Sequence, residues 1–147
     1  MNPDMFPQCK NRRSIVGKRP DLDNRFFRSA WEANYARYLN WMMARREINS
    51  WGYEVETFEF AKIKRGSRFY TPDFKVFFPD GRFEFHEIKG YMDPKSATKL
   101  KRMKKYFPHI PVVLIDKTIY RQIAVQFGPM LNGWEGRYGL RTRRILK

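Results

Sequence analysis

The chain has 147 residues, and its 30 lysines and arginines against 15 acidic residues give a formal net charge of +15. This length is enough for one domain with its own core, and an aromatic content of 17% argues against a disordered basic tail. The excess of positive charge predicts a polyanionic partner, with nucleic acid as the first choice.

Cysteine and histidine usage excludes zinc. One cysteine and two histidines cannot form a Cys/His zinc site within one chain. A bound metal would therefore need oxygen ligands. No apolar run reaches membrane-spanning length and the first residues lack a signal-peptide core, so we expect a cytoplasmic protein without a membrane partner.

The N-terminal segment, residues 1–24, mixes prolines and basic residues without periodicity. This pattern predicts a flexible basic arm. Two interpretations stay open: an ordinary frayed terminus, or an arm whose Arg12 and Arg13 contact phosphates. The folded domain is expected over residues 25–130.

A long first helix is predicted from Ser29 to about Ile48. Residues 29–32 have a capping-box pattern, and aromatic and apolar side chains follow at helical spacing. Glu32 can close the capping box or point from the first turn toward a site elsewhere, and the local pattern favours the cap.

After Gly52, which is expected to end the helical segment, residues 53–60 alternate like a strand. Glu54 and Glu56 fall on one face of it, where we expect them to meet solvent or basic side chains. Lys62, Lys64 and Arg65 then belong to an exposed basic loop.

Residues 69–90 predict a β-hairpin. The run Pro79-Asp80-Gly81 suits a three-residue loop with a G1 bulge, which would pair Phe78 with Arg82. A two-residue Asp80-Gly81 loop would instead shift the register by one residue and turn every side chain of one strand to the other face.

The three-residue loop places Asp73 opposite Glu87, with Lys89 two residues further along on the same face. Two opposed carboxylates repel each other unless a positive group lies between them, and a hard divalent cation meets that need. Glu84 and His86 fall on the opposite face and are excluded from the site.

A second helix is predicted to begin at Asp93-Pro94, with proline at its first position. Its outer face is basic and carries no acid, so we expect it to contact phosphates. The six cations of this face are Lys95, Lys99, Lys101, Arg102, Lys104 and Lys105. His109 follows in a proline-rich turn and is interpreted as structural.

The apolar run at residues 112–116 is typical of a buried parallel strand. Ile119, Ile123 and Phe127 then mark a short last helix that ends at Gly128-Pro129. Residues 131–147 are expected to form a basic C-terminal tail, with Trp134 as a docking residue. The order helix, three antiparallel strands, helix, strand and helix predicts an α/β fold with a central mixed sheet flanked by helices.

The pattern Pro72-Asp73 followed by Glu87-Ile-Lys89 resembles the PD-(D/E)XK nuclease superfamily, whose restriction-endonuclease-like core has the order αβββαβ. Residues 26–32, 70–74 and 87–91 together resemble the endonuclease I group of phage Holliday-junction resolving enzymes. The resemblance covers roughly residues 26–116 and leaves out both arms.

This resemblance implies that Asp73 and Glu87 bind Mg²⁺ or Mn²⁺, one or two ions per site, while Lys89 assists the attacking water. It also implies that Glu32 completes the site, and Glu54 occupies the position of a further acid. The implied protein is a homodimeric endodeoxyribonuclease that makes paired nicks in branched double-stranded DNA such as four-way junctions, in the cytoplasm of the host cell if it is phage-encoded. The alternative is a general phage DNase or a restriction-like endonuclease of the same superfamily.

The residue chemistry agrees with these roles. Magnesium takes oxygen ligands and keeps several waters, so one or two carboxylates and a backbone carbonyl, such as that of Ile88, are sufficient. Lys89 should be protonated at rest, and it could stabilise developing charge or orient the nucleophile. The residues expected to bind DNA are Arg12, Arg13, Lys62, Lys64, Arg65, Lys95, Lys99, Arg102, Arg141, Arg143 and Arg144.

Overall fold

The computed structural model of the protein describes residues 16–136. Within them, three α-helices and a four-stranded mixed sheet make up the main body, and two small two-stranded ribbons accompany it. The predicted arm residues Arg12, Arg13, Arg141, Arg143 and Arg144 lie outside the described part of the chain, as does most of the expected C-terminal tail.

The central sheet has the strand order β3-β6-β7-β8. Its strands are β3 (Ser50–Tyr53), β6 (Phe74–Phe77), β7 (Phe83–Lys89) and β8 (Val112–Asp116). The first three are antiparallel, and β8 runs parallel to β7. The mixed α/β architecture expected from the sequence is therefore confirmed.

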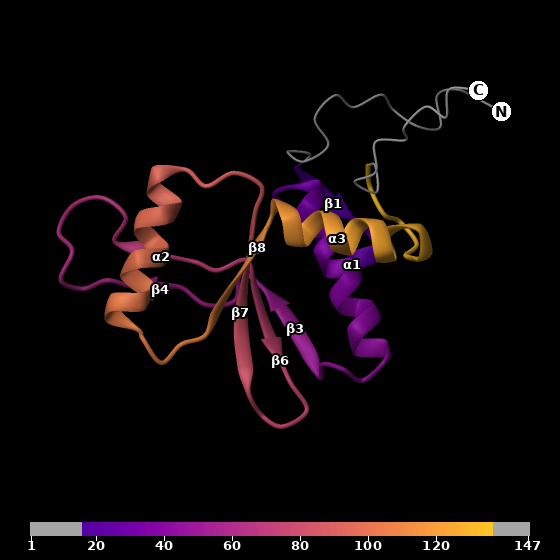
Figure 1. Ribbon diagram of the computed structural model, residues 1–147, viewed down its shortest axis with the longest axis horizontal. Coiled ribbons are helices and arrows are strands. Elements are labelled where there is room, and N and C mark those ends of the chain that lie inside the picture. Colours follow the sequence, from indigo (N-terminus) through magenta and orange to yellow (C-terminus); the bar gives the residue numbers. More distant parts are fainter. Residues whose placement is uncertain (1–15, 137–147) are drawn as a thin grey trace.

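Helices cover both faces of this sheet (Figure 1). Helices α1 (Ala30–Ala44) and α3 (Lys117–Phe127) lie on one side, and α2 (Pro94–Tyr106) lies on the other. Phe74, Val76 and Ile88 point into the core with α1 and α3, whereas Phe85 points into a second core with Met103 of α2. The sheet thus separates two apolar layers.

The predicted hairpin register is confirmed. The Phe78 N–H donates to the Arg82 carbonyl at 2.9 Å, Gly81 has φ +88°, and Phe77 pairs with Phe83. The run Pro79-Asp80-Gly81 therefore forms the three-residue loop, and the register-shifting two-residue loop is excluded.

Helix α1 ends at Ala44 rather than near Ile48 because its C-terminus closes on a left-handed residue. Arg46 has φ +62°, and the Glu47 N–H returns to the Met42 carbonyl at 3.0 Å. This is the Schellman arrangement, here with arginine in place of the usual glycine. Gly52, expected to end the helical segment, instead lies in β3 opposite Lys75.

The strand predicted over residues 53–60 is also wrong as a single element. Strand β3 ends at Tyr53 and the chain turns at Glu54, which has φ +50°. It then forms a separate ribbon in which β4 (Phe58–Glu59) pairs with β5 (Phe69–Tyr70). The alternating pattern arose from two short strands joined by a kink.

The expected N-terminal arm over residues 1–24 is ordered near its end. Strands β1 (Gly17–Arg19) and β2 (Arg25–Phe27) pair around the 3₁₀ turn η3 (Pro20–Leu22). Leu22 belongs to the core and Arg19 is buried. The folded part of the chain therefore includes residues before 25, starting with β1 in the described part.

After β7, the predicted helix starts and the predicted parallel strand are confirmed. Asp93 caps α2 by accepting from the Ser96 N–H, with Pro94 in the first turn, and Asp116 caps α3. Strand β8 is parallel as predicted, but it is the edge strand and only Ile115 is fully buried. A second 3₁₀ turn, η4 (Gly128–Met130), follows α3. None of the helices in residues 16–136 is long and apolar enough to span a bilayer.

Candidate metal centre

Four carboxylates from four different segments line one pocket of about 380 Å³. Glu32 comes from α1, Glu54 follows β3, Asp73 precedes β6, and Glu87 lies in β7. Lys89 lines the same pocket. The structure therefore brings together the four residues that were expected to be catalytic. It also brings in Glu54, which the resemblance named as a further acid and the strand pattern had assigned to solvent or a basic partner.

Asp73 and Glu87 meet where the β6–β7 pairing ends. Phe74 pairs with His86, so Asp73 and Glu87 are the next residues along each strand. The Asp73 N–H donates to Glu87 Oε2 at 3.3 Å, and Asp73 Oδ2 accepts from the Ile88 N–H at 2.8 Å. Both side chains are buried, and hydrogen bonds fix their directions.

A tyrosine next to the motif holds Glu87 in place. The Tyr70 hydroxyl donates to Glu87 Oε2 at 2.9 Å. Burial and the adjacent Glu87 charge raise the pKa of Tyr70 well above its usual range, so this hydroxyl remains a donor. The sequence analysis missed this role, although Tyr70 stands only three residues before Asp73.

Glu32 lies in a capped first turn and also lines the pocket, so the two alternatives that the sequence left open are compatible. The Ser29 hydroxyl accepts from the Glu32 N–H at 3.1 Å, and it donates to Glu32 Oε2 at 2.8 Å. The capping contact thus orients the carboxylate, which is buried and lines the pocket. The cap positions the acid.

Glu54 reaches the pocket through the kink after β3. Its N–H donates to the Asp73 carbonyl at 2.8 Å, which carries the β3–β6 pairing one step past Tyr53. Its side chain forms an ion pair with Arg28 at 3.0 Å. The predicted basic partner of Glu54 therefore exists, and Arg28 lines the same pocket. Glu56 meets Lys75 at 2.9 Å instead.

Most acids of this pocket have no cation paired with them within residues 16–136. Among the ion pairs of residues 16–136, Arg28 reaches Glu54 and Lys89 reaches Asp93 at 3.9 Å, while Glu32, Asp73 and Glu87 take part in none. Burial, then the charges of Glu87 and Glu32, raise the pKa of Asp73 far above its ordinary value. Burial likewise raises the pKa of Glu87, against the hydrogen bond from Tyr70 and the charge of Lys89.

Three of these acids could hold a metal ion. One carboxylate oxygen each from Glu32, Glu54 and Asp73 lie within 4.8 Å of one another. Glu87 is outside this group, although sequence reasoning had named it with Asp73 as the first pair of ligands. Ile88 lines the pocket and its N–H is bound to Asp73, while the expected role of its carbonyl stays a prediction.

The Trp31 ring packs on Gly90, and these two residues are the sequence neighbours of Glu32 and Lys89. A Cβ atom at Gly90 would lie 3.0 Å from the Trp31 side chain, so only glycine fits without displacing the ring. Trp31 precedes Glu32 in α1 and stacks on Tyr120 of α3 at 3.9 Å between ring centroids. This contact sets how closely the end of β7 approaches the start of α1.

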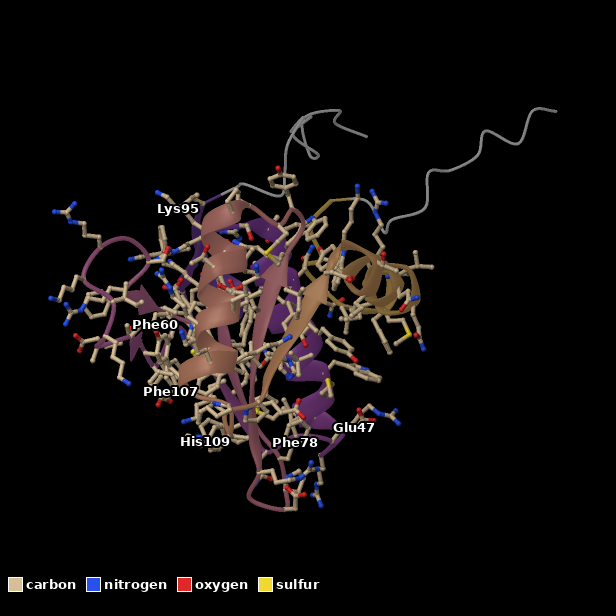
Figure 2. All side chains as sticks on the ribbon, turned by 60° about the vertical axis from the view of Figure 1, so that its left-hand side comes forward. Glu47, Phe60, Phe78, Lys95, Phe107 and His109 are labelled. Atoms are coloured by element: carbon tan, nitrogen blue, oxygen red, sulfur yellow. The ribbon has the colours of Figure 1, made fainter. Side chains whose placement is uncertain are left out.

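Basic side chains surround the pocket on the α2 side. Lys99 lines it, and Lys95 marks the end of α2 that borders it, whereas the exposed His109 follows the opposite end of the helix (Figure 2). Lys62, Lys64 and Arg65 are exposed, as expected. Arg102, predicted to bind DNA, donates to the carbonyls of Gly66 and Ser67 at 3.0 and 2.8 Å, and so ties the basic loop to α2.

A second charge cluster, built around two buried arginines, lies further along α1, and sequence reasoning did not detect it. Arg37 contacts Asp21 at 2.7 Å and Glu135 at 2.8 Å, while Arg19 contacts Glu135 at 2.9 Å. Asn34 accepts from Arg37 and from the Glu135 N–H, and it donates to the Glu135 carbonyl. We call these five residues the arginine cluster.

The arginine cluster explains how residues 134–136 are held. Trp134 stacks near Tyr120, with 6.1 Å between ring centroids, as its predicted docking role requires. Glu135 supplies the charged anchor beside it. At Gly133, with φ +82°, a Cβ atom would lie 2.7 Å from Asp21 Oδ2. The first residues of the expected C-terminal tail therefore belong to the folded domain.

Comparisons of this chain with protein-family models, with curated proteins and with solved structures found no match.

Proposed function

We propose that the protein is a divalent-metal-dependent endonuclease that hydrolyses phosphodiester bonds in branched DNA, with four-way junctions as its preferred substrate. One observation carries the proposal: four acids and one lysine from four separate segments meet in a single pocket on a strongly basic chain. Clustered acids of this kind would destabilise the fold unless they bind something positive. The proposed fold is the restriction-endonuclease-like core that the motif resembles.

The donor set of the pocket fits a hard divalent cation. All candidate ligands are carboxylate oxygens, which Mg²⁺ and Mn²⁺ prefer, and among residues 16–136 no cysteine or histidine lines the pocket. Glu32, Glu54 and Asp73 would hold the ion. Glu87, beside Asp73, would add a negative charge next to it. A divalent ion held there supplies Lewis-acid activation of a phosphodiester and of water.

The chain's own groups have separate tasks in the proposed reaction. Tyr70 and the Asp73 N–H hold Glu87, and the Ser29 hydroxyl holds Glu32, so the acids are oriented before substrate arrives. Lys89 is half-buried at the rim, where its ammonium can donate to a phosphate oxygen or to the attacking water. The cations of α2 and the tethered loop attract the DNA backbone.

A junction assay tests this proposal directly. The protein is incubated with a four-way junction and with a linear duplex of matched sequence, each in Mg²⁺ and in EDTA. We expect paired nicks at the junction in Mg²⁺ only, made by a homodimer. Equal cutting of both substrates would indicate a general DNase or restriction-like enzyme instead. Binding without cleavage would contradict an enzymatic role, and cleavage in EDTA would contradict the metal centre.

A further inference from the structure

Phe69 places an exposed aromatic ring at the rim of the acidic pocket. It is 54% exposed and lines the same pocket as Asp73 and Glu87. Its neighbour in β5, Tyr70, points inward and is 4% exposed, with its hydroxyl on Glu87. Adjacent positions of one short strand therefore supply an inner anchor for the acid and an outer ring beside it.

The backbone that carries Phe69 is fixed on both sides. Phe69 pairs with Glu59 across the ribbon, and the Arg68 side chain contacts Glu59 at 2.6 Å. On the far side, the Thr71 and Thr57 hydroxyls lie 2.7 Å apart. The Arg68 guanidinium lies 5.9 Å from the Phe69 ring centroid, within range of a cation–π contact. The ring is thus presented at a set position, with much of its surface in water.

The chemistry around the ring defines what it can bind. Lys99 and Arg28 line the same pocket, so an incoming phosphate meets positive charge next to a flat apolar surface. A nucleotide offers this combination, a phosphate attached to a flat base. In an intact duplex each base face is covered by its neighbours, so an external ring can stack only where base stacking is interrupted.

We propose that Phe69 is a stacking platform for an unstacked nucleobase beside the scissile phosphate. The inference depends on the proposed nuclease function and narrows its substrate to DNA with exposed base faces: branch points, flaps and single-stranded ends. A ring stacks equally well on any base, so this selection is for DNA structure and not for sequence.

Binding measured without cleavage tests the stacking role. In the Asp73→Asn background and in Mg²⁺, affinities are measured by fluorescence anisotropy for a four-way junction, a single-stranded oligonucleotide and a blunt duplex. We expect Phe69→Ala to weaken binding of the first two by about 5- to 100-fold and to leave duplex binding within about twofold. Phe69→Trp should retain wild-type affinity, and 2-aminopurine at the branch point should lose its fluorescence change in Phe69→Ala.

Phe26→Ala is the matched control, because Phe26 is 51% exposed but does not line the pocket. We expect it to leave all three affinities unchanged. Equal weakening for all substrates, or none, would overturn the stacking role. A changed oligomeric state in Phe69→Ala with unchanged DNA binding would also overturn it, because a second copy would then cover the ring. If Phe69→Ala behaves as expected but the unmodified chain cleaves no DNA, the nuclease proposal fails and the binding site remains.

Discussion

The two charge clusters to which α1 contributes differ in how their charges are balanced. The arginine cluster joins two arginines, Arg19 and Arg37, to two acids, Asp21 and Glu135, and Asn34 supplies further hydrogen bonds. The acidic pocket gathers four carboxylates, three of them without an ion-pair partner in the described chain. The comparison shows that a cluster of charges does not by itself mark a candidate site, whereas buried carboxylates without counter-charges do.

The largest expected effect separates the clusters by activity. Asp73→Asn should lower junction cleavage at least about 100-fold, because it removes a carboxylate at the centre of the pocket. It should also keep or raise the thermal stability in EDTA, because the amide resembles the protonated acid that the raised pKa of Asp73 favours.

Cleavage rates and melting curves of Asp73→Asn check both expectations. Asp80→Asn is the control, since Asp80 is an exposed acid at the other end of the same hairpin. Loss of folding in Asp73→Asn but not in Asp80→Asn would give the acidic pocket the same structural role as the arginine cluster.

Arg37→Met should have the opposite profile. Of the ion-pair partners that the described residues give Glu135 and Asp21, Arg19 then remains, so we expect the free energy of unfolding to fall by about 3 kcal/mol. Mg²⁺ affinity of the folded protein should not change. Urea denaturation and calorimetric titration with Mg²⁺ measure the two quantities. Arg45→Met, which removes an exposed ion pair with Glu47 just beyond the same helix, should change stability by less than about 1 kcal/mol.

The pH dependence of stability should come from the acidic pocket. In EDTA, native Asp73 keeps its proton at pH values where the unfolded chain has released it, because burial and neighbouring acids raise its pKa. The native state then binds more protons than the unfolded chain. The contribution of Asp73 to the free energy of unfolding is therefore fully present below about pH 4 and falls as the pH rises, by up to roughly 1.4 kcal/mol per pH unit.

Denaturation curves in EDTA from pH 5 to pH 8 measure this slope. Asp73→Asn should flatten it, and Mg²⁺ should offset it by favouring the ionised acids. A slope that Asp73→Asn leaves unchanged would assign the pH dependence to other groups and break the contrast between the two clusters.

The smallest expected effect concerns a supporting group. Tyr70→Phe removes the hydroxyl that holds Glu87 and should lower cleavage by about tenfold, as loss of such outer contacts commonly does. Rates over a range of Mg²⁺ concentrations show whether the loss lies in metal affinity. Tyr106→Phe is the comparison, because Tyr106 is also an α2-side aromatic residue but does not line the pocket. Equal effects of the two substitutions would exclude the positioning role.

The contrast between the clusters also explains what the sequence could predict. The acidic pocket was predictable from local chemistry in one part: the three-residue loop fixed the register of Asp73 and Glu87. Glu32, which the local pattern favoured as a cap, was named for the site only by the resemblance. Glu54 was placed correctly only by resemblance, because its position depends on a left-handed turn and on a bond to the Asp73 carbonyl 19 residues away in the chain.

The arginine cluster has no local signature. Asn34 and Glu135 are 101 residues apart, and Arg19 looks in sequence like one more charge of a basic arm. Arg37 falls within a helix whose aromatic stripe dominates the pattern. Side-chain complementarity between distant segments leaves no periodicity or spacing to read, so only the folded chain reveals it.

The packing of Trp31 on Gly90 has a consequence for any redesign of the acidic pocket. Because the indole rests on the glycine that follows Lys89 and is sequence-adjacent to Glu32, the amine and that acid cannot be repositioned independently. A redesign that widens the pocket for a bulkier nucleic-acid backbone would have to change residues 31 and 90 together. A side chain at position 90 would press on the Trp31 ring, which stands next to Glu32 in the chain.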